Sequence, residues 1–149
     1  MKINDPTTLL RISFWIGAIV DGFVGVQMLL PDFWAAFNRL TAHQDSPELS
    51  AALGIGASLM IGWTVLLLWA DRRPAERKGV LLITVFPVVT GLFAYNLLGI
   101  ASGLRTIGGT ALALAFQVGV TLLFVYSYLQ ADKVPQKAKD GKREGFGAS

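Results

Sequence analysis

One carboxylate, Asp21, lies near the middle of the long apolar run from Arg11 to Leu30. About 20 helical residues cross a hydrocarbon core roughly 30 Å thick, so this run is long enough to span a bilayer. An acid at mid-membrane depth is costly, and such residues mark ligand or proton pathways or hold helices together by hydrogen bonds. Asp21 is therefore the first candidate site residue: a ligand or proton contact, a structural hydrogen-bonding group, or a contact to a partner subunit.

Other polar side chains are predicted at the same depth in the membrane. Counted from the estimated span ends at about 1.5 Å per residue, a layer within roughly 6 Å of one level holds Asp21, Ser58, Thr90 and Gln117. Gly17 and Gly25 lie one turn before and after Asp21, and small residues mark a face where helices approach closely. We therefore expect Asp21 inside the bundle, hydrogen-bonded to the Gln117 amide or to one of the two hydroxyls of the layer.

Residue type and depth add further candidate binding residues: Gln27, Trp63, Tyr95 and Asn96. All but Trp63 fall near the far ends of their spans, where they would rim an opening above the polar layer or act as interfacial anchors. Trp63 is deeper than the interface where tryptophan concentrates. It is therefore expected in the core or in the wall of an apolar cavity.

These residues need helices to position them, and the hydropathy pattern predicts an all-α, four-transmembrane-helix bundle. A transmembrane domain of residues 1–131 is expected, with spans at about 12–30, 50–70, 79–100 and 107–131. Pro87 lies inside the third span and predicts a kink, because it cannot donate a hydrogen bond to the carbonyl of Ile83. Residues 132–149 are charged and nearly free of large apolar groups, which predicts a disordered tail.

The connection between the first two spans begins with PDFWAAFNRL, residues 31–40. Pro31 suits the first turn of a helix, and apolar residues recur there at helical spacing. A short amphipathic helix that lies in the membrane interface is therefore expected, with Trp34 at headgroup depth. An ordered loop with aromatic anchors is the alternative.

The basic residues predict the orientation of the bundle. Four spans place both termini and the 71–78 loop on one side of the membrane. That side holds eleven of the thirteen Lys and Arg residues: Lys2, Arg11, Arg72, Arg73, Arg77, Lys78, Lys133, Lys137, Lys139, Lys142 and Arg143. Only Arg39 and Arg105 fall on the other side, and bases concentrate on the cytoplasmic side. We expect a multi-pass protein of the cytoplasmic membrane with both termini cytoplasmic.

The composition excludes several kinds of chemistry. Only 15% of the 149 residues are charged, against about a quarter in soluble domains. The chain has no cysteine, which excludes disulfides and thiolate metal sites. His43 is the single histidine, which excludes bis-histidine haem and three-histidine zinc within one chain. No Ser/His/Asp set or phosphate-cradling loop is present, so an enzyme is the least favoured class and no cofactor or metal is expected.

The pattern of an arginine, a glycine-bearing helix and then LLPDFW resembles the DoxX-like group of small four-helix membrane proteins. The resemblance covers roughly residues 11–40 and the four-span layout, and it implies a topology more than an activity. The chain also resembles small multidrug transporters in having four short helices and an acid in the first. That acid is Asp21 where the transporters carry a glutamate, and AYNLLGIASG lacks the tryptophan of their third-helix motif.

Three functions remain open from the sequence. The first is a membrane protein that binds a small apolar or lipid-like molecule among its helices, with Asp21 as the polar contact. The second is an accessory or scaffolding subunit that docks on a larger membrane complex through small-residue faces such as Gly54, Ser58 and Gly62. A homo-oligomer is the alternative assembly. The third is a proton-coupled transporter. The expected partners are the lipid bilayer and such a ligand or complex, and no nucleic acid is expected because the bases lie at membrane boundaries.

Overall fold

The computed structural model describes residues 6–38, 46–103 and 105–132. Every regular element in these ranges is helical, which confirms the all-α prediction. The elements are α1 (Pro6–Met28), α2 (Pro31–Phe37), α3 (Pro47–Asp71), α4 (Gly79–Ile83), η1 (Thr84–Val89), α5 (Thr90–Ala101) and α6 (Ile107–Asp132). The predictions made for Arg39, Leu40 and the tail from residue 133 onward lie outside the described residues.

In the described part of the chain, four helices are long and apolar enough to cross a membrane. They are Pro6–Met28, Pro47–Asp71, Gly79–Ala101 and Ile107–Asp132, the third being α4, η1 and α5 in series. Each overlaps one span expected from hydropathy, although α1 begins at Pro6 and ends at Met28 instead of covering 12–30. The four apolar helices indicate a small multi-pass membrane protein.

The helices begin where the sequence supplies start signals. Ser46 caps α3, since its hydroxyl accepts a hydrogen bond from the Leu49 backbone N–H at 3.1 Å, and Pro47 occupies the first turn. Pro31 likewise opens α2. The α5–α6 turn includes Gly103, whose φ of 73° lies in the left-handed region that glycine adopts without strain.

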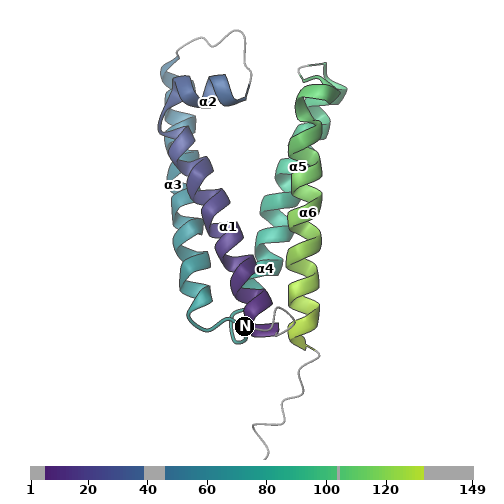
Figure 1. Cartoon of the computed structure of the whole chain (residues 1–149). Coiled ribbons are helices and arrows are strands. Elements are labelled where there is room, and N and C mark those ends of the chain that lie inside the picture. The colour runs from purple at the N-terminus through teal and green to yellow at the C-terminus, as the bar shows by residue number, and fades with distance from the viewer. Residues whose placement is uncertain (1–5, 39–45, 104, 133–149) are drawn as a thin grey trace, which may run out of the picture.

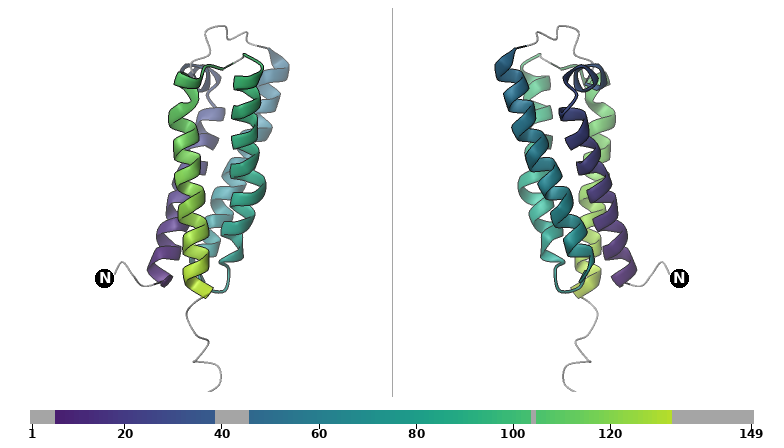
Figure 2. Two further views of the ribbon diagram at one scale, coloured as in Figure 1. Left: turned by 90° about the vertical axis from the view of Figure 1, so that its right-hand side faces the viewer. Right: turned by 90° about the vertical axis from the view of Figure 1, so that its left-hand side faces the viewer.

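The helices form two pairs, α1 with α3 and the α4–η1–α5 series with α6 (Figure 1). The pairs lie close together at the end that holds the start of α1 and the end of α6, and they diverge toward the other end. We call these the convergent end and the divergent end. The divergent end holds α2 and the α5–α6 turn, as the views turned by 90° also show (Figure 2).

The hydrophobic core lies in the convergent half of the bundle. All four membrane-length helices contribute to it: Leu10, Phe14, Ala18, Leu67, Ala70, Leu81, Val85 and Phe124. The hydroxyls of Ser13 and Ser127, both fully buried, lie 2.7 Å apart and hydrogen-bond α1 to α6 inside this core. Hydrogen bonds of this kind join transmembrane helices at a typical gain of about 0.6 kcal/mol.

Charged residues tie the helix ends together at the convergent end. Arg11 of α1 pairs with Asp71 of α3 at 3.8 Å, and Lys78 pairs with Asp132 of α6. The Arg77 guanidinium lies 3.4 Å from the ring centroid of Trp69 and donates to that residue's carbonyl. These contacts link the α3–α4 loop to both helix pairs.

The predicted kink at Pro87 takes the form of a π-helix. The six residues of η1 surround this proline, which has no N–H to donate to the Ile83 carbonyl. Thr84 at the start of η1 donates its hydroxyl to the Val80 carbonyl at 2.8 Å. The same hydroxyl accepts a hydrogen bond from the Trp63 indole N–H at 3.1 Å, which ties η1 to α3.

The residues after the first membrane-length helix form α2, a helix of seven residues that lies across the divergent end of α1 (Figure 1). Its Phe33 and Phe37 rings contact Phe23 of α1 edge-on, with centroids 6.5 and 5.7 Å apart. Asn38 closes the helix by donating its side-chain amide to the Trp34 carbonyl at 2.9 Å. The segment is therefore a helix and not the ordered loop.

Candidate functional site

Asp21 lies on the face of α1 that packs against the other helices. A Cβ added at Gly17, one turn toward the convergent end, would lie 3.0 Å from Leu67 of α3 and 3.1 Å from Phe124 of α6. A Cβ added at Gly25, one turn the other way, would lie 3.0 Å from Ile61 of α3. This confirms the expectation that the glycines beside Asp21 meet neighbouring helices.

The Asp21 carboxyl has a buried oxygen without a partner. Its Oδ2 atom is shielded from solvent and accepts no hydrogen bond from any residue that the structure describes. Asp21 follows Ala18, the last α1 residue of the hydrophobic core, by about one turn, so it lies just beyond the core along α1. A buried polar atom without a partner costs about 1–3 kcal/mol, and native proteins rarely leave one without a role.

The prediction that Asp21 forms hydrogen bonds with Gln117, Ser58 or Thr90 is wrong, since no such bond is found among the described residues. Ser58 is exposed, and its hydroxyl donates to the Gly54 carbonyl of its own helix at 3.0 Å. Thr90 is also exposed, and the Gln117 side chain accepts from Asn96. Helical hydroxyls bond readily to the carbonyl one turn back, so equal depth does not bring two side chains together.

Three polar residues of the divergent half form a connected chain between α5 and α6. The Asn96 amide donates to Gln117 Oε1 at 3.4 Å, and Asn96 Oδ1 accepts from Arg105 Nη1 at 3.1 Å. Asn96 is buried, with 6% of its surface exposed. The Arg105 guanidinium also lies 5.1 Å from the ring centroid of Tyr95. The structure thus brings together Gln117, Asn96 and Tyr95, which the sequence singled out separately, and adds Arg105.

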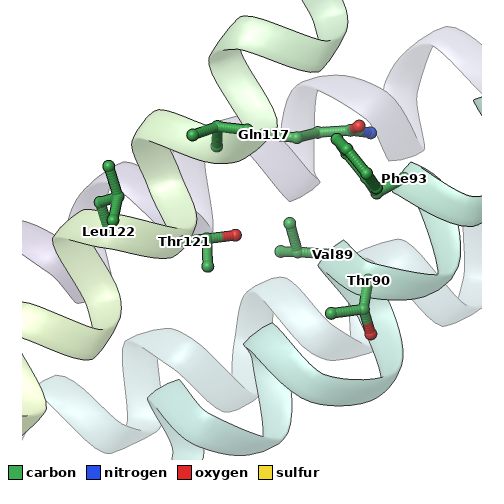
Figure 3. A pocket seen from close by; sticks show the side chains of 7 residues that line it. Val89, Thr90, Phe93, Gln117, Thr121 and Leu122 are labelled. Atoms are coloured by element: carbon green, nitrogen blue, oxygen red, sulfur yellow. The ribbon is translucent and has the colours of Figure 1, made fainter.

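A groove of about 210 Å³ lies between the third and fourth membrane-length helices, next to this polar chain. Its lining comes from η1, α5 and α6: Val89, Thr90, Phe93, Gln117, Val118, Thr121 and Leu122. Figure 3 shows Gln117 beside Phe93, with Val89 and Thr121 directed toward the same space. Two members of the predicted polar layer, Thr90 and Gln117, therefore line one groove, and Asp21 and Ser58 are not among its lining residues.

Trp63 and Gln27 occupy other places. Trp63 is half-buried and packs against the core, as expected, while its indole N–H bonds to Thr84. Gln27 is 3% exposed, and its Nε2 atom has no hydrogen-bond partner among the described residues. No hydrogen bond in the described ranges joins Gln27 to Tyr95 or Asn96, so the predicted rim is not assembled from these three.

Within the described ranges, the face of α3 that carries Gly54, Ser58 and Gly62 makes no close contact with another helix. A Cβ added at Gly54 or Gly62 would meet no heavy atom within 4 Å, and Ser58 between them is exposed. The close approach occurs instead at Gly56, where an added Cβ would lie 3.0 Å from the Met28 sulfur of α1. The face of Gly54, Ser58 and Gly62 is therefore open, and the close contact of α3 with α1 lies at Gly56.

No family model, curated protein or solved structure matches this chain. In the ranges that the structure describes, no group of three or more His, Cys, Asp or Glu side chains is placed to hold a metal ion. The chemistry that the site offers is hydrogen bonding at Asp21 and along the Gln117–Asn96–Arg105 chain, beside apolar surfaces.

Proposed function

We propose that this small multi-pass membrane protein binds a small apolar or lipid-like molecule between its helices, with Asp21 as the polar contact. The observation that carries the proposal is the buried Asp21 Oδ2 atom, which no described residue satisfies. A ligand with an apolar body and one hydrogen-bond donor would satisfy that oxygen and recover the cost of burying it. One turn from the acid, Gly17 lies against the apolar side chains of Leu67 and Phe124, so apolar groups are available to the body of such a ligand.

The test is to identify what co-purifies with the full chain. Wild type, Asp21→Asn and Ser58→Ala would be purified in mild detergent, and the bound small molecules extracted and quantified by mass spectrometry. Asp21→Asn places an amide N–H against the ligand's donor, so we expect about tenfold less of the bound species, which corresponds to about 1.4 kcal/mol. Ser58→Ala alters an exposed hydroxyl on another face and should leave the content unchanged. Equal content in all three proteins would refute the proposal.

A second candidate function is that of an accessory subunit, and the open face of Gly54, Ser58 and Gly62 favours it. Faces of small residues mediate close helix contacts in membranes, and this face has no partner helix among the described residues. Native mass analysis in mild detergent distinguishes the two functions. An accessory subunit migrates with a larger complex that Gly62→Leu disrupts, whereas the ligand binder keeps its size in that variant.

The proposal also covers the orientation of the bundle, the membrane that holds it and the family that it resembles. We place both termini on the cytoplasmic side of the cytoplasmic membrane, because the convergent end carries Arg11 and the four bases of the 71–78 loop. We place α2 in the membrane interface. The resemblance of residues 11–40 to DoxX-like proteins supports the topology, and proton-coupled transport remains a weaker alternative that would require activity driven by a proton gradient and lost in Asp21→Asn.

A further inference from the structure

The polar chain of the divergent half ends in a positive charge that no described acid neutralises. Arg105 lies in the α5–α6 turn, where its backbone N–H donates to the Gly99 carbonyl at 3.0 Å. Its side chain folds back across α5, since a Cβ added at Gly99 would lie 3.0 Å from Arg105 Cδ. The glycine therefore leaves the space in which the arginine lies.

This conformation holds the guanidinium at the edge of the bundle. Arg105 is half-buried, donates through Nη1 to Asn96 and lies over the Tyr95 ring. A guanidinium has five N–H donors in a planar fork that suits phosphate and carboxylate oxygens. Among the described residues no ion pair joins Arg105 to an acid, in contrast to Arg11 and Lys78 at the convergent end.

The groove between α5 and α6 continues from the polar chain toward the centre of the bundle. Gln117 both lines the groove and accepts the Asn96 hydrogen bond. On the third membrane-length helix the groove wall runs from Phe93 to Val89, about 6 Å at 1.5 Å per residue. Its volume of about 210 Å³ exceeds the roughly 150 Å³ of an apolar cavity that holds benzene.

We infer that this face binds an anionic lipid, with its phosphate at Arg105 and part of an acyl chain in the groove lined by Val89, Phe93 and Thr121. The charge selects an anionic headgroup, and the adjoining apolar groove selects a molecule that carries a hydrocarbon chain. The site is separate from that of Asp21, so it stands whether or not the proposed function does.

The experiment measures lipid retention by the full chain in native mass spectrometry. Phosphatidylglycerol and phosphatidylcholine with the same acyl chains would compete for wild type, Arg105→Gln, Arg105→Lys and Arg72→Gln. A charge-assisted hydrogen bond predicts about a tenfold preference of wild type for phosphatidylglycerol. Arg105→Gln should abolish that preference, Arg105→Lys should retain part of it, and Arg72→Gln, which removes an exposed arginine at the convergent end, should retain all of it.

Two further measurements are needed. One distinguishes binding of the whole lipid from binding of a free anion, and the other distinguishes loss of the Arg105 contact from a folding defect. Val89→Trp would fill the groove and should reduce retention of the lipid, whereas displacement of the lipid by inorganic phosphate would overturn the inference in favour of a free anion. If Arg105→Gln does not fold, the wild-type preference should fall when salt rises from about 0.1 M to about 1 M, because the screening length shortens from about 10 to about 3 Å. A wild type without preference, or one insensitive to salt, also overturns it.

Discussion

Gly17 and Ser13 hold α1 against both of its neighbours. Without a Cβ at position 17, the backbone of α1 comes within contact distance of Leu67 and Phe124 at once. One turn away, Ser13 hydrogen-bonds to Ser127 of α6. Inside a membrane, close packing and interhelical hydrogen bonds drive association, because lipid tails are as apolar as leucine. This short part of α1 therefore joins the two helix pairs.

The residue-scale prediction follows from that contact. Gly17→Leu would force Leu67 or Phe124 out of place, and overpacking of this kind costs about 1–3 kcal/mol. The matched control is Gly119→Leu on α6, where an added Cβ meets no heavy atom within 4 Å. Unfolding titrations in mixed micelles would measure both variants. We expect a lower free energy of unfolding for Gly17→Leu alone, and an equal loss in both variants would contradict the packing described here.

At the scale of the elements, hydropathy predicted how many membrane-length helices form but not which faces meet. The depth of a residue in the membrane can be counted along the sequence, and this count placed Ser58 at the level of Asp21. The direction in which a side chain points around the helix axis cannot be counted in this way, and Ser58 lies on an exposed face. Almost uniformly apolar helices carry little signal about their buried face. Pro87 predicted an irregularity in the third membrane-length helix. It did not predict that the helix would widen into a π-helix there.

The polar chain shows the same limit. Asn96 and Gln117 were recognised as unusual residues for a membrane span, but their contact depends on how α5 packs against α6. In the sequence, Arg105 indicates only the orientation of the bundle. Its position over Tyr95 depends on the turn at Gly103 and on the space at Gly99, which no spacing rule provides.

A depth measurement tests whether α2 lies in the membrane interface. The chain has no cysteine, so a single spin label can be placed at Ala36→Cys, an exposed position of α2. In lipid vesicles we expect this label to be reached by both oxygen and a polar nickel reagent, as at headgroup depth. A label at Gly119→Cys, in the middle of α6, should be reached by oxygen alone. Access by the nickel reagent alone at position 36 would place α2 in water.

At the scale of the whole molecule, charge and packing are concentrated at the same end. The core, the Ser13–Ser127 hydrogen bond and the ion pairs Arg11–Asp71 and Lys78–Asp132 all belong to the convergent half. The divergent half has few fully buried apolar residues among those described and holds the polar chain, from which the groove extends to the middle of the bundle. Stability and candidate binding surfaces are thus separated along the length of the bundle.

The same distribution of charge gives the whole-molecule prediction. Because five bases cluster in the described part of the convergent end, against Arg105 at the divergent end, the convergent end should face the cytoplasm. Single cysteines at Ala75→Cys in the α3–α4 loop and Ser102→Cys in the α5–α6 turn would be treated with a membrane-impermeant maleimide on intact cells. We expect position 102 to react at once and position 75 only after permeabilisation, and the reverse pattern would invert the orientation.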